Sequence, residues 1–294
     1  MNVRSLKPDQ ERAARDQYIH ELNQLFERHG LDLEVTVSDL TFLSEVVMDA
    51  LKDKRHISSS LTKAISPPIH HGEFYHYTCG DAADKIFDSG VLRLTTVRKR
   101  IADGEIRSFL YRFGFDYPLK TATGESNPRF HESIASQVFY ASFTDTSLTP
   151  SEEKYFWHNF AKKDGARLKF ALSLKSGCLR RVVYGNGVDR WANMFKEISD
   201  LTKRSLGKVF FWVDAATVCA LLLPEQFGVE KETRLITRRG CGLSIGTEGN
   251  YEYLKANIGE NAAIGLKMEL KEIQTNRSVP NHRDVNLIPR IIEA

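Results

Sequence analysis

The feature that most constrains the fold is a series of short strand-like segments that begins at Gly72 and is interrupted by helices. Aromatic and β-branched residues, which favour strands, gather in these segments. The expected strands are residues 74–78, 91–96, 137–143, 166–174, 179–184, 231–237 and 265–273, with a further apolar segment at 285–292, and the expected helices are 81–89, 152–162, 190–206 and 209–223. Because strands and helices do not alternate regularly, the pattern predicts an α+β fold rather than a doubly wound parallel sheet.

The segment before Gly72 has a different pattern, with apolar residues at helical spacing. Tyr18, Leu22 and Phe26 predict a helix over residues 11–28, which Gly30 ends. A second apolar stripe predicts another helix over residues 38–51. This part of the chain is therefore expected to be a helical appendage.

A domain boundary is expected near residue 70. The polar stretch 56–66 is followed by Pro67-Pro68, which would break any helix. The chain is thus divided into a helical N-terminal region, residues 1–70, and a larger domain, residues 71–294. Within the larger domain, residues 98–136 contain several glycines and prolines and are expected to form a partly helical insertion.

Charge and cysteine content narrow the function classes. The net charge of +3 is too small to indicate a nucleic-acid partner, and the basic runs, of which 98–100 is the densest, are more typical of a solvated surface. The longest apolar run, 209–223, is interrupted by Asp214 and is short for a membrane span. The four cysteines lack zinc-site spacing, and the first residues do not resemble a signal peptide. We therefore expect a cytoplasmic protein with reduced cysteines, no metal site and no membrane partner.

Three segments carry candidate chemistry, and the first is the strand 74–78. On a strand, His76 and Thr78 point to one face, whereas Tyr75 and Tyr77 point to the other. An imidazole beside a hydroxyl can form hydrogen bonds with a ribose or an amide. A structural strand with one hydrogen-bonded histidine is the commoner alternative.

The second segment is aromatic, and it includes Tyr140 and Ser142 on a predicted strand and Trp157 on a predicted helix. Aromatic side chains can stack on a planar ring, although they more often belong to a hydrophobic core. Tyr140, Ser142 and Trp157 therefore remain open as candidates.

The third segment contains Glu230, Glu232 and Arg234, which would share one face of a strand, with Leu235 on the opposite face. Such a group is either a solvated charge ladder or a site. A carboxylate near the core needs a partner or a function. Asp103 and Glu105 are a weaker carboxylate pair, and the sequence contains no phosphate-binding glycine loop, dinucleotide fingerprint or nucleophile elbow.

The order of these segments resembles a bacterial family of uncharacterised domains related to the ADP-ribosyltransferase superfamily of the His-Tyr-Glu type. The resemblance covers residues 73–275, and its most specific block is Phe227-x-x-Glu230-x-Glu232-x-Arg234. The other matching blocks are residues 75–78, 90–96, 140–144, 157–161, 165–170 and 182–184. Residues 1–70 lie outside it.

The resemblance implies a split antiparallel β-sandwich that binds NAD in the cleft between its sheets. It implies that His76 contacts the nicotinamide ribose and that Thr78 supports this contact. It implies that Tyr140, or a nearby residue (Ser142 or Trp157), contacts the nicotinamide. Glu232 would be catalytic, Glu230 would be a second carboxylate, and Arg234 would orient the pair. A fixed carboxylate would stabilise the positive charge that develops on the ribose as the nicotinamide leaves.

The expected function is an NAD-dependent mono-ADP-ribosyltransferase that modifies a protein or a nucleic acid, with a role as a toxin or an antiviral defence effector. One alternative is an NAD glycohydrolase, which uses water as the acceptor. Another is an inactive binding module of the same fold, because fold does not fix function. A partner protein that inhibits the enzyme is also compatible with this reading.

Overall fold

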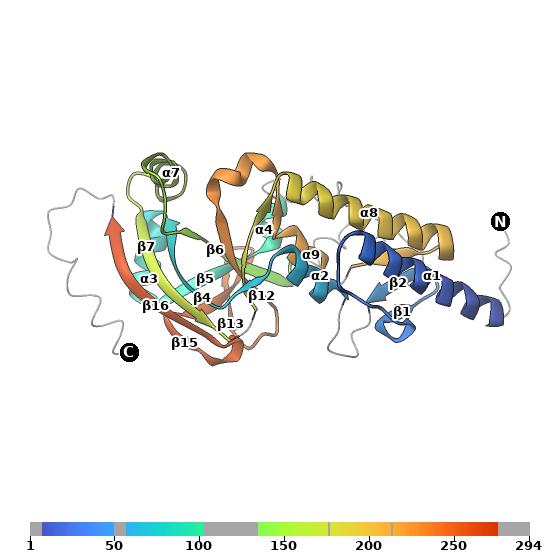
Figure 1. Ribbon diagram of the computed structural model, residues 1–294. Coiled ribbons are helices and arrows are strands. Elements are labelled where there is room, and N and C mark those ends of the chain that lie inside the picture. The colour runs from blue at the N-terminus through green and yellow to red at the C-terminus, as the bar shows by residue number, and fades with distance from the viewer. Residues whose placement is uncertain (1–7, 50–56, 103–134, 176, 213, 276–294) are drawn as a thin grey trace.

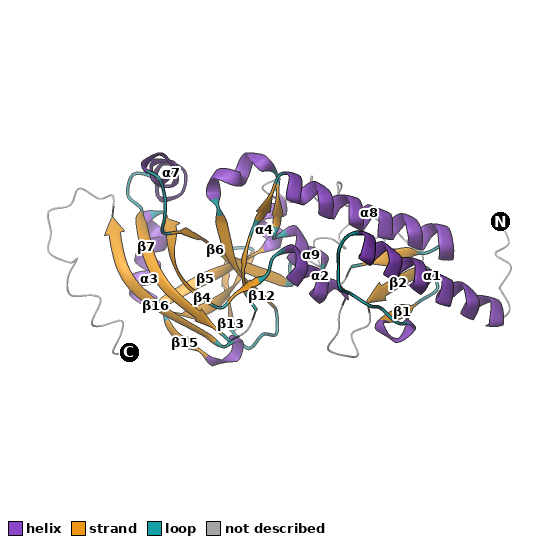
Figure 2. Ribbon diagram, viewed as in Figure 1, coloured by secondary structure: helices purple, strands orange, loops and turns teal. Residues whose placement is uncertain are grey.

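The computed structural model describes residues 8–49, 57–102, 135–175, 177–212 and 214–275, and it has an elongated shape (Figure 1). Most strands gather at one end, and the two longest helices lie side by side at the other (Figure 2). The predicted pair Asp103 and Glu105, most of the expected insertion, and the segment 285–292 fall outside the described residues. Within the described ranges, no helix is both long and apolar enough to cross a lipid bilayer.

A large sheet dominates the strand-rich end, and its described strand pairs are all antiparallel. One arm contains β13 (Ser244–Glu248), β14 (Tyr251–Asn257), β5 (Val91–Thr96), β6 (Val138–Asp145), β12 (Glu232–Arg238), β8 (Leu179–Arg181) and β3 (Pro68–Ile69). The other arm contains β4 (His71–Thr78), β7 (Ala166–Leu174), β16 (Leu266–Thr275) and β15 (Gly259–Asn261). The α+β class is therefore confirmed.

The two arms join along a short seam on strand β6. The β4 ladder reaches β6 at only Phe74↔Asp145 and Tyr75↔Thr144, and the β5 ladder reaches the same edge at only Thr95↔Tyr140 and Thr96↔Phe139. Among the described strands, the edge of β6 between these two ladders therefore has no neighbour. Away from the seam, both arms contribute to one hydrophobic cluster, for example through Phe170 and Leu254.

Short helices cover this end of the molecule. Helix α3 (Gly80–Ser89) ends at Gly90, whose φ of 62° is the left-handed conformation that glycine adopts easily, as expected from the sequence. Helix α4 (Val97–Ala102) follows β5. Helix α7 (Pro150–Phe156) begins with a capping box between Thr149 and Glu152 and continues into η2 (Trp157–Ala161), a π-helical turn.

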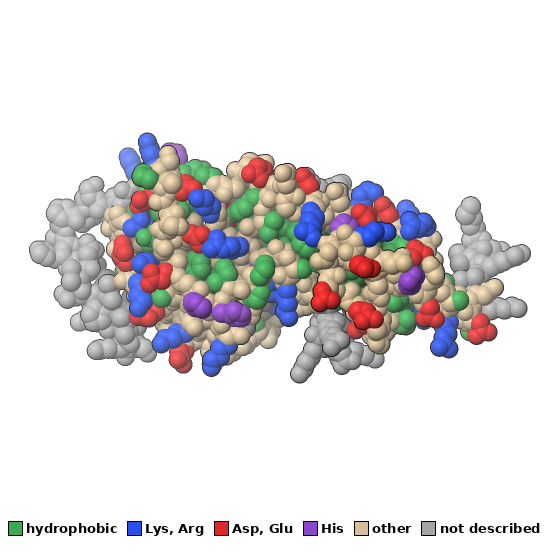
Figure 3. All heavy atoms as spheres, in the orientation of Figure 1, with side chains coloured by type: hydrophobic (Ala, Val, Ile, Leu, Met, Phe, Trp, Pro, Cys, Tyr) green, Lys and Arg blue, Asp and Glu red, His purple; other side chains and the backbone are tan. Residues whose placement is uncertain are grey.

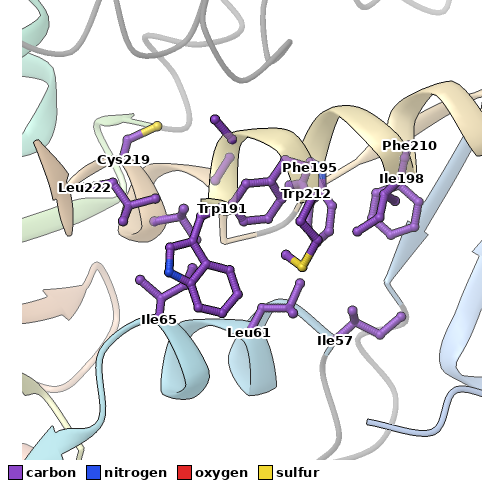
Figure 4. Packing of buried hydrophobic residues seen from close by; sticks show 14 of the residues in the cluster. Ile57, Leu61, Ile65, Trp191, Phe195, Ile198, Phe210, Trp212, Cys219 and Leu222 are labelled. Carbon is purple, nitrogen blue, oxygen red and sulfur yellow. The ribbon is translucent and has the colours of Figure 1, made fainter. Parts of the chain in front are cut away.

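The helical end is built from two distant parts of the chain, and its core continues to one face of the large sheet, where it includes Val138, Tyr140 and Ile236. Its elements are α1 (Pro8–Arg28), η1 (Val37–Asp39), β1 (Leu40–Phe42), β2 (Val46–Asp49), α2 (Ile57–Ile65), β9 (Val183–Tyr184), α8 (Asn186–Leu206), β10 (Val209–Phe211), α9 (Ala215–Cys219) and β11 (Leu222–Leu223). Figure 4 shows Leu61 and Ile65 of α2 facing Trp191 and Phe195 of α8. The segment before residue 70 thus shares a core with residues 188–222.

The predicted helices over 38–51 and 209–223 are wrong. Strands β1 and β2 replace most of the first, and β10, α9 and β11 replace the second. Strand β10 pairs in parallel with β2, so that Phe210 lies beside Val47. These two segments are far apart in the sequence, and their β-branched and aromatic residues form strands because each supplies the other's partner. The appendage is consequently not purely helical.

Two smaller expectations also need correction. The polar stretch 56–66 contains helix α2, because Ile57, Leu61 and Ile65 recur at four-residue spacing on its buried face. The expected strand 179–184 is two strands: β8 pairs with β12 in the large sheet, whereas β9 pairs with β11 in a small parallel one. The chain passes from one end of the molecule to the other at this point.

Candidate functional site

A cavity of about 330 Å³ lies against the unpaired edge of β6. Residues from both faces of that strand line it: Ala141 and Phe143 from the face that packs into the large-sheet core, and Tyr140 from the opposite face. Its size is at the lower end of the range of about 300–1,000 Å³ for small-molecule sites. The cavity therefore exists because the sheet divides here, which leaves space that a neighbouring strand would fill.

His76 of strand β4 closes the seam with a side-chain hydrogen bond. Its Nδ1 lies 2.8 Å from the carbonyl oxygen of Ser142. Because a carbonyl only accepts, Nδ1 carries the proton, which leaves Nε2 of the neutral ring as an acceptor. Burial lowers the pKa of His76, and the hydrogen bond that its ring donates to the Ser142 carbonyl only partly opposes this effect. Thr78, on the same strand face, also lines the cavity.

Glu232 and Arg234 form a buried ion pair at what we call the inner end of the cavity. Oε2 of Glu232 lies 2.7 Å from Nη2 of Arg234, and the two side chains are 6% and 2% exposed. Burial alone would lower the pKa of Arg234, but the negative charge of Glu232 raises it above its ordinary value. Glu232 lines the cavity, whereas Arg234 lies behind it.

Three further contacts hold this pair in place. Nη1 of Arg234 donates to the carbonyl oxygen of Ala220, at the end of α9, and the guanidinium carbon lies 4.4 Å from the centre of the Tyr140 ring. The backbone N–H of Glu232 donates to the Tyr184 hydroxyl over 3.0 Å. Burial, together with the charge of Glu232, raises the pKa of Tyr184. The ion pair is therefore positioned by groups from β6, from β9 and from the end of α9.

Glu230 also lines the cavity, but it lies on a different element from Glu232. The prediction that it shares a strand face with Glu232 and Arg234 is wrong, because it ends the 3₁₀ helix η3 (Glu225–Glu230). Lys231, with a φ of 40°, turns the chain between the two carboxylates. The Tyr155 hydroxyl donates to Oε1 of Glu230 over 3.4 Å. Both carboxylates line the cavity, but strand alternation does not set their spacing.

The aromatic wall of the cavity comes from the end of α7 and from η2. Phe156 and Phe160 line it, and Phe156 stacks on Tyr77 with 5.0 Å between the ring centres. Trp157, a predicted ligand-binding residue, is not among the lining residues and packs edge-on against Tyr77 instead. The sequence pointed to this aromatic segment but not to the two phenylalanines, whose four-residue spacing on a helix was the available signal.

A solvent-exposed part of the cavity lining, which we call the outer end, is basic. Lys85 of α3, Arg93 of β5 and Lys99 of α4 line it, together with Glu248 at the end of β13. Lys99 belongs to the basic run that the sequence assigned to a solvated surface, and the other three were not singled out. Nothing in the local sequence links these positions, because only the packing of four elements brings them together.

Six of the predicted site residues line the cavity, whereas Trp157 and Arg234 do not: the six are His76, Thr78, Tyr140, Ser142, Glu230 and Glu232. In the described part of the chain, no group of three or more histidine, cysteine or acidic side chains is placed to hold a metal ion. No protein-family model matches the sequence, and neither curated proteins nor solved structures include a significant match. The site itself combines a fixed carboxylate, a neutral imidazole, an aromatic wall and a basic outer end, which we also call the basic mouth.

Proposed function

We propose that this cavity binds NAD and that the protein is an NAD-dependent mono-ADP-ribosyltransferase. The proposal rests on one observation: the buried carboxylate of Glu232 and the neutral imidazole of His76, far apart in the sequence, line the same cavity. The split between the two arms of the sheet is compatible with the sandwich that the family resemblance implies. The volume suits the nicotinamide riboside half of the dinucleotide, with the remainder extending toward the basic mouth.

Glu232 would stabilise the transition state of nicotinamide loss. The bond between ribose C1′ and the nicotinamide ring nitrogen breaks, both electrons pass to that nitrogen, and positive charge develops on the sugar. The carboxylate is paired with Arg234, and the backbone N–H of Glu232 is held by the Tyr184 hydroxyl, so the charge does not need to reorganise as the transition state forms. The acceptor nucleophile then bonds to C1′ and gives its proton to a base, for which Glu230 is placed in the same cavity.

The other lining residues would orient the substrate. Nε2 of His76 can accept a hydrogen bond from a ribose hydroxyl, and Thr78 can support the same contact. Tyr140 packs against the Arg234 guanidinium, so Phe156 and Phe160 are the better candidates for stacking on the nicotinamide ring. This assignment replaces Trp157 and gives Tyr140 a supporting role.

A second candidate function is NAD hydrolysis. Glu230 lies in the cavity itself, where it could deprotonate a bound water as readily as a macromolecular acceptor. On the face seen in Figure 3, positive and negative side chains are intermixed, which favours neither a protein nor a nucleic acid as acceptor. A toxin or antiviral defence role, and an inhibitory partner protein, belong to the proposal only through the family resemblance.

The test is to incubate the full chain with NAD labelled in its adenylate half, alone and with cell lysate, RNA or DNA. Label on a macromolecule supports the transferase, and free ADP-ribose without such label supports the hydrolase. Glu232→Gln should lower the rate about 100- to 1,000-fold. Glu269→Gln, which changes an exposed carboxylate away from the cavity, should not. If the wild-type protein neither binds nor cleaves NAD, the proposal is wrong.

A further inference from the structure

Two cations hold one carboxylate at the outer end of the cavity, and a third lies close by. Nζ of Lys85 lies 2.6 Å from Oε1 of Glu248, and Nη1 of Arg93 lies 2.7 Å from Oε2. The hydrogen bond from Lys85, followed by the charges of Arg93, Lys85 and Lys99, holds the pKa of Glu248 below its ordinary value. Three positive charges thus surround a single negative one.

Two of the three cations, Arg93 and Lys99, also contact an aromatic ring. The Arg93 guanidinium carbon lies 4.4 Å from the ring centre of Tyr253, and Nζ of Lys99 lies 5.6 Å from that of Tyr251. Such cation–π contacts restrict long side chains that would otherwise be mobile. Arg93 and Lys99 would therefore keep these contacts if Glu248 moved away.

Glu248, by contrast, is easily displaced. It is 58% exposed and ends strand β13, directly before the Gly249–Asn250 turn of the β13–β14 hairpin. Exposed ion pairs of this kind are weak, because water solvates both partners and salt screens them. Strand β13, to which Glu248 belongs, is an edge strand of the large sheet and is largely exposed. Among the described residues, no second strand pairs with its outer edge.

We propose that Lys85, Arg93 and Lys99 form an anion subsite for the diphosphate group of a ligand that shares this cavity, and that Glu248 occupies the subsite while the ligand is absent. The two carboxylate oxygens already accept from two different cations, as two phosphate oxygens would. A diphosphate brings more charge and more acceptors than one carboxylate, so it displaces Glu248. The identity of the ligand as NAD rests on the proposed function, whereas the chemistry of the subsite does not.

Calorimetric titration of the full chain with inorganic pyrophosphate tests the subsite directly. Glu248→Gln should bind pyrophosphate about 2- to 5-fold more tightly, because the competing charge is gone. The double variant Lys85→Gln/Arg93→Gln should bind it about tenfold more weakly. Glu269→Gln is the matched control, because this carboxylate is also exposed and 2.6 Å from a lysine, yet it lies outside the cavity; it should bind like wild type.

Equal pyrophosphate affinity in wild type, Glu248→Gln and the double variant would overturn the subsite. The same variants assayed with NAD separate this result from the proposed function. Pyrophosphate binding with the expected changes, but no NAD binding, would support the subsite and contradict the NAD proposal. NAD turnover whose KM is unchanged in both variants would support the enzyme and overturn the subsite.

Discussion

The inner and outer ends of the cavity each have an ion pair between a glutamate and an arginine, but one pair is buried and the other is exposed to solvent. At the inner end, Glu232 and Arg234 form an ion pair of 2.7 Å with side chains 6% and 2% exposed. At the outer end, Glu248 and Arg93 form one of the same length, with side chains 58% and 32% exposed. The distances are equal, so burial alone decides what each pair can do. A buried charge cannot lose its partner without a large penalty, whereas an exposed one exchanges its partner for water or for a ligand.

The largest expected effect is on stability, from Arg234→Met. This change leaves the buried Glu232 carboxylate without its cation and should lower the free energy of unfolding by about 3–5 kcal/mol. The comparable change at the outer end, Arg93→Met, should shift the urea denaturation midpoint far less. Similar shifts in the two variants would show that burial does not distinguish the pairs.

The next effect is on catalysis, from Glu232→Gln. Loss of the fixed negative charge should lower NAD turnover by about 100- to 1,000-fold, which corresponds to about 3–4 kcal/mol of transition-state stabilisation. Rates should be divided by the folded fraction, measured by circular dichroism, because the same change also disturbs Arg234. A folded Glu232→Gln protein with wild-type turnover would exclude this carboxylate as the catalytic group.

A smaller effect concerns pH and His76. Because its pKa is lowered in the folded state, the unfolded chain binds more protons once the pH falls below about 6.5. Stability should therefore fall between pH 7.5 and 5.5, by at most about 1.4 kcal/mol per pH unit from this residue. In His76→Gln the fall should be shallower, whereas the exposed His71→Gln should follow wild type. Parallel curves for all three proteins would contradict the lowered pKa of His76.

The smallest effect is that of Glu248→Gln on stability. The side chain is exposed, so the denaturation midpoint should stay within experimental error of wild type even while ligand affinity changes. A clear loss of stability would mean that Glu248 holds the β13–β14 hairpin in place and is not a displaceable occupant of the subsite.

The sequence predicted those elements whose signal is local. The strand 166–174 matches β7, and Gly90 ends α3 as expected. It failed for the segments of β2 and β10: β2 pairs with its neighbour β1 and also, in parallel, with β10, which lies more than half of the chain away. Local periodicity contains no information about such a partner, so both segments were taken for helices.

The same distinction applies to the site. The sequence pointed to His76, Glu230 and Glu232, and all three line one cavity. The predicted position of Glu230 on a strand was wrong, because Lys231 adopts a left-handed conformation that interrupts the strand pattern. Lysine rarely adopts this conformation, so the sequence contains no signal for it. The basic mouth could not be anticipated, since its residues come from four elements that only the tertiary fold brings together.

The hydrogen bond from Arg234 to the Ala220 carbonyl couples the carboxylate to the helical end of the molecule. Ala220 follows α9, whose side chains belong to the same core as Tyr18 of α1 and Ile65 of α2. Helix α1 does not line the cavity, so the support of the carboxylate depends in part on residues that no ligand would touch. Substitutions within α1 that loosen its packing should therefore weaken activity without removing any contact to the ligand.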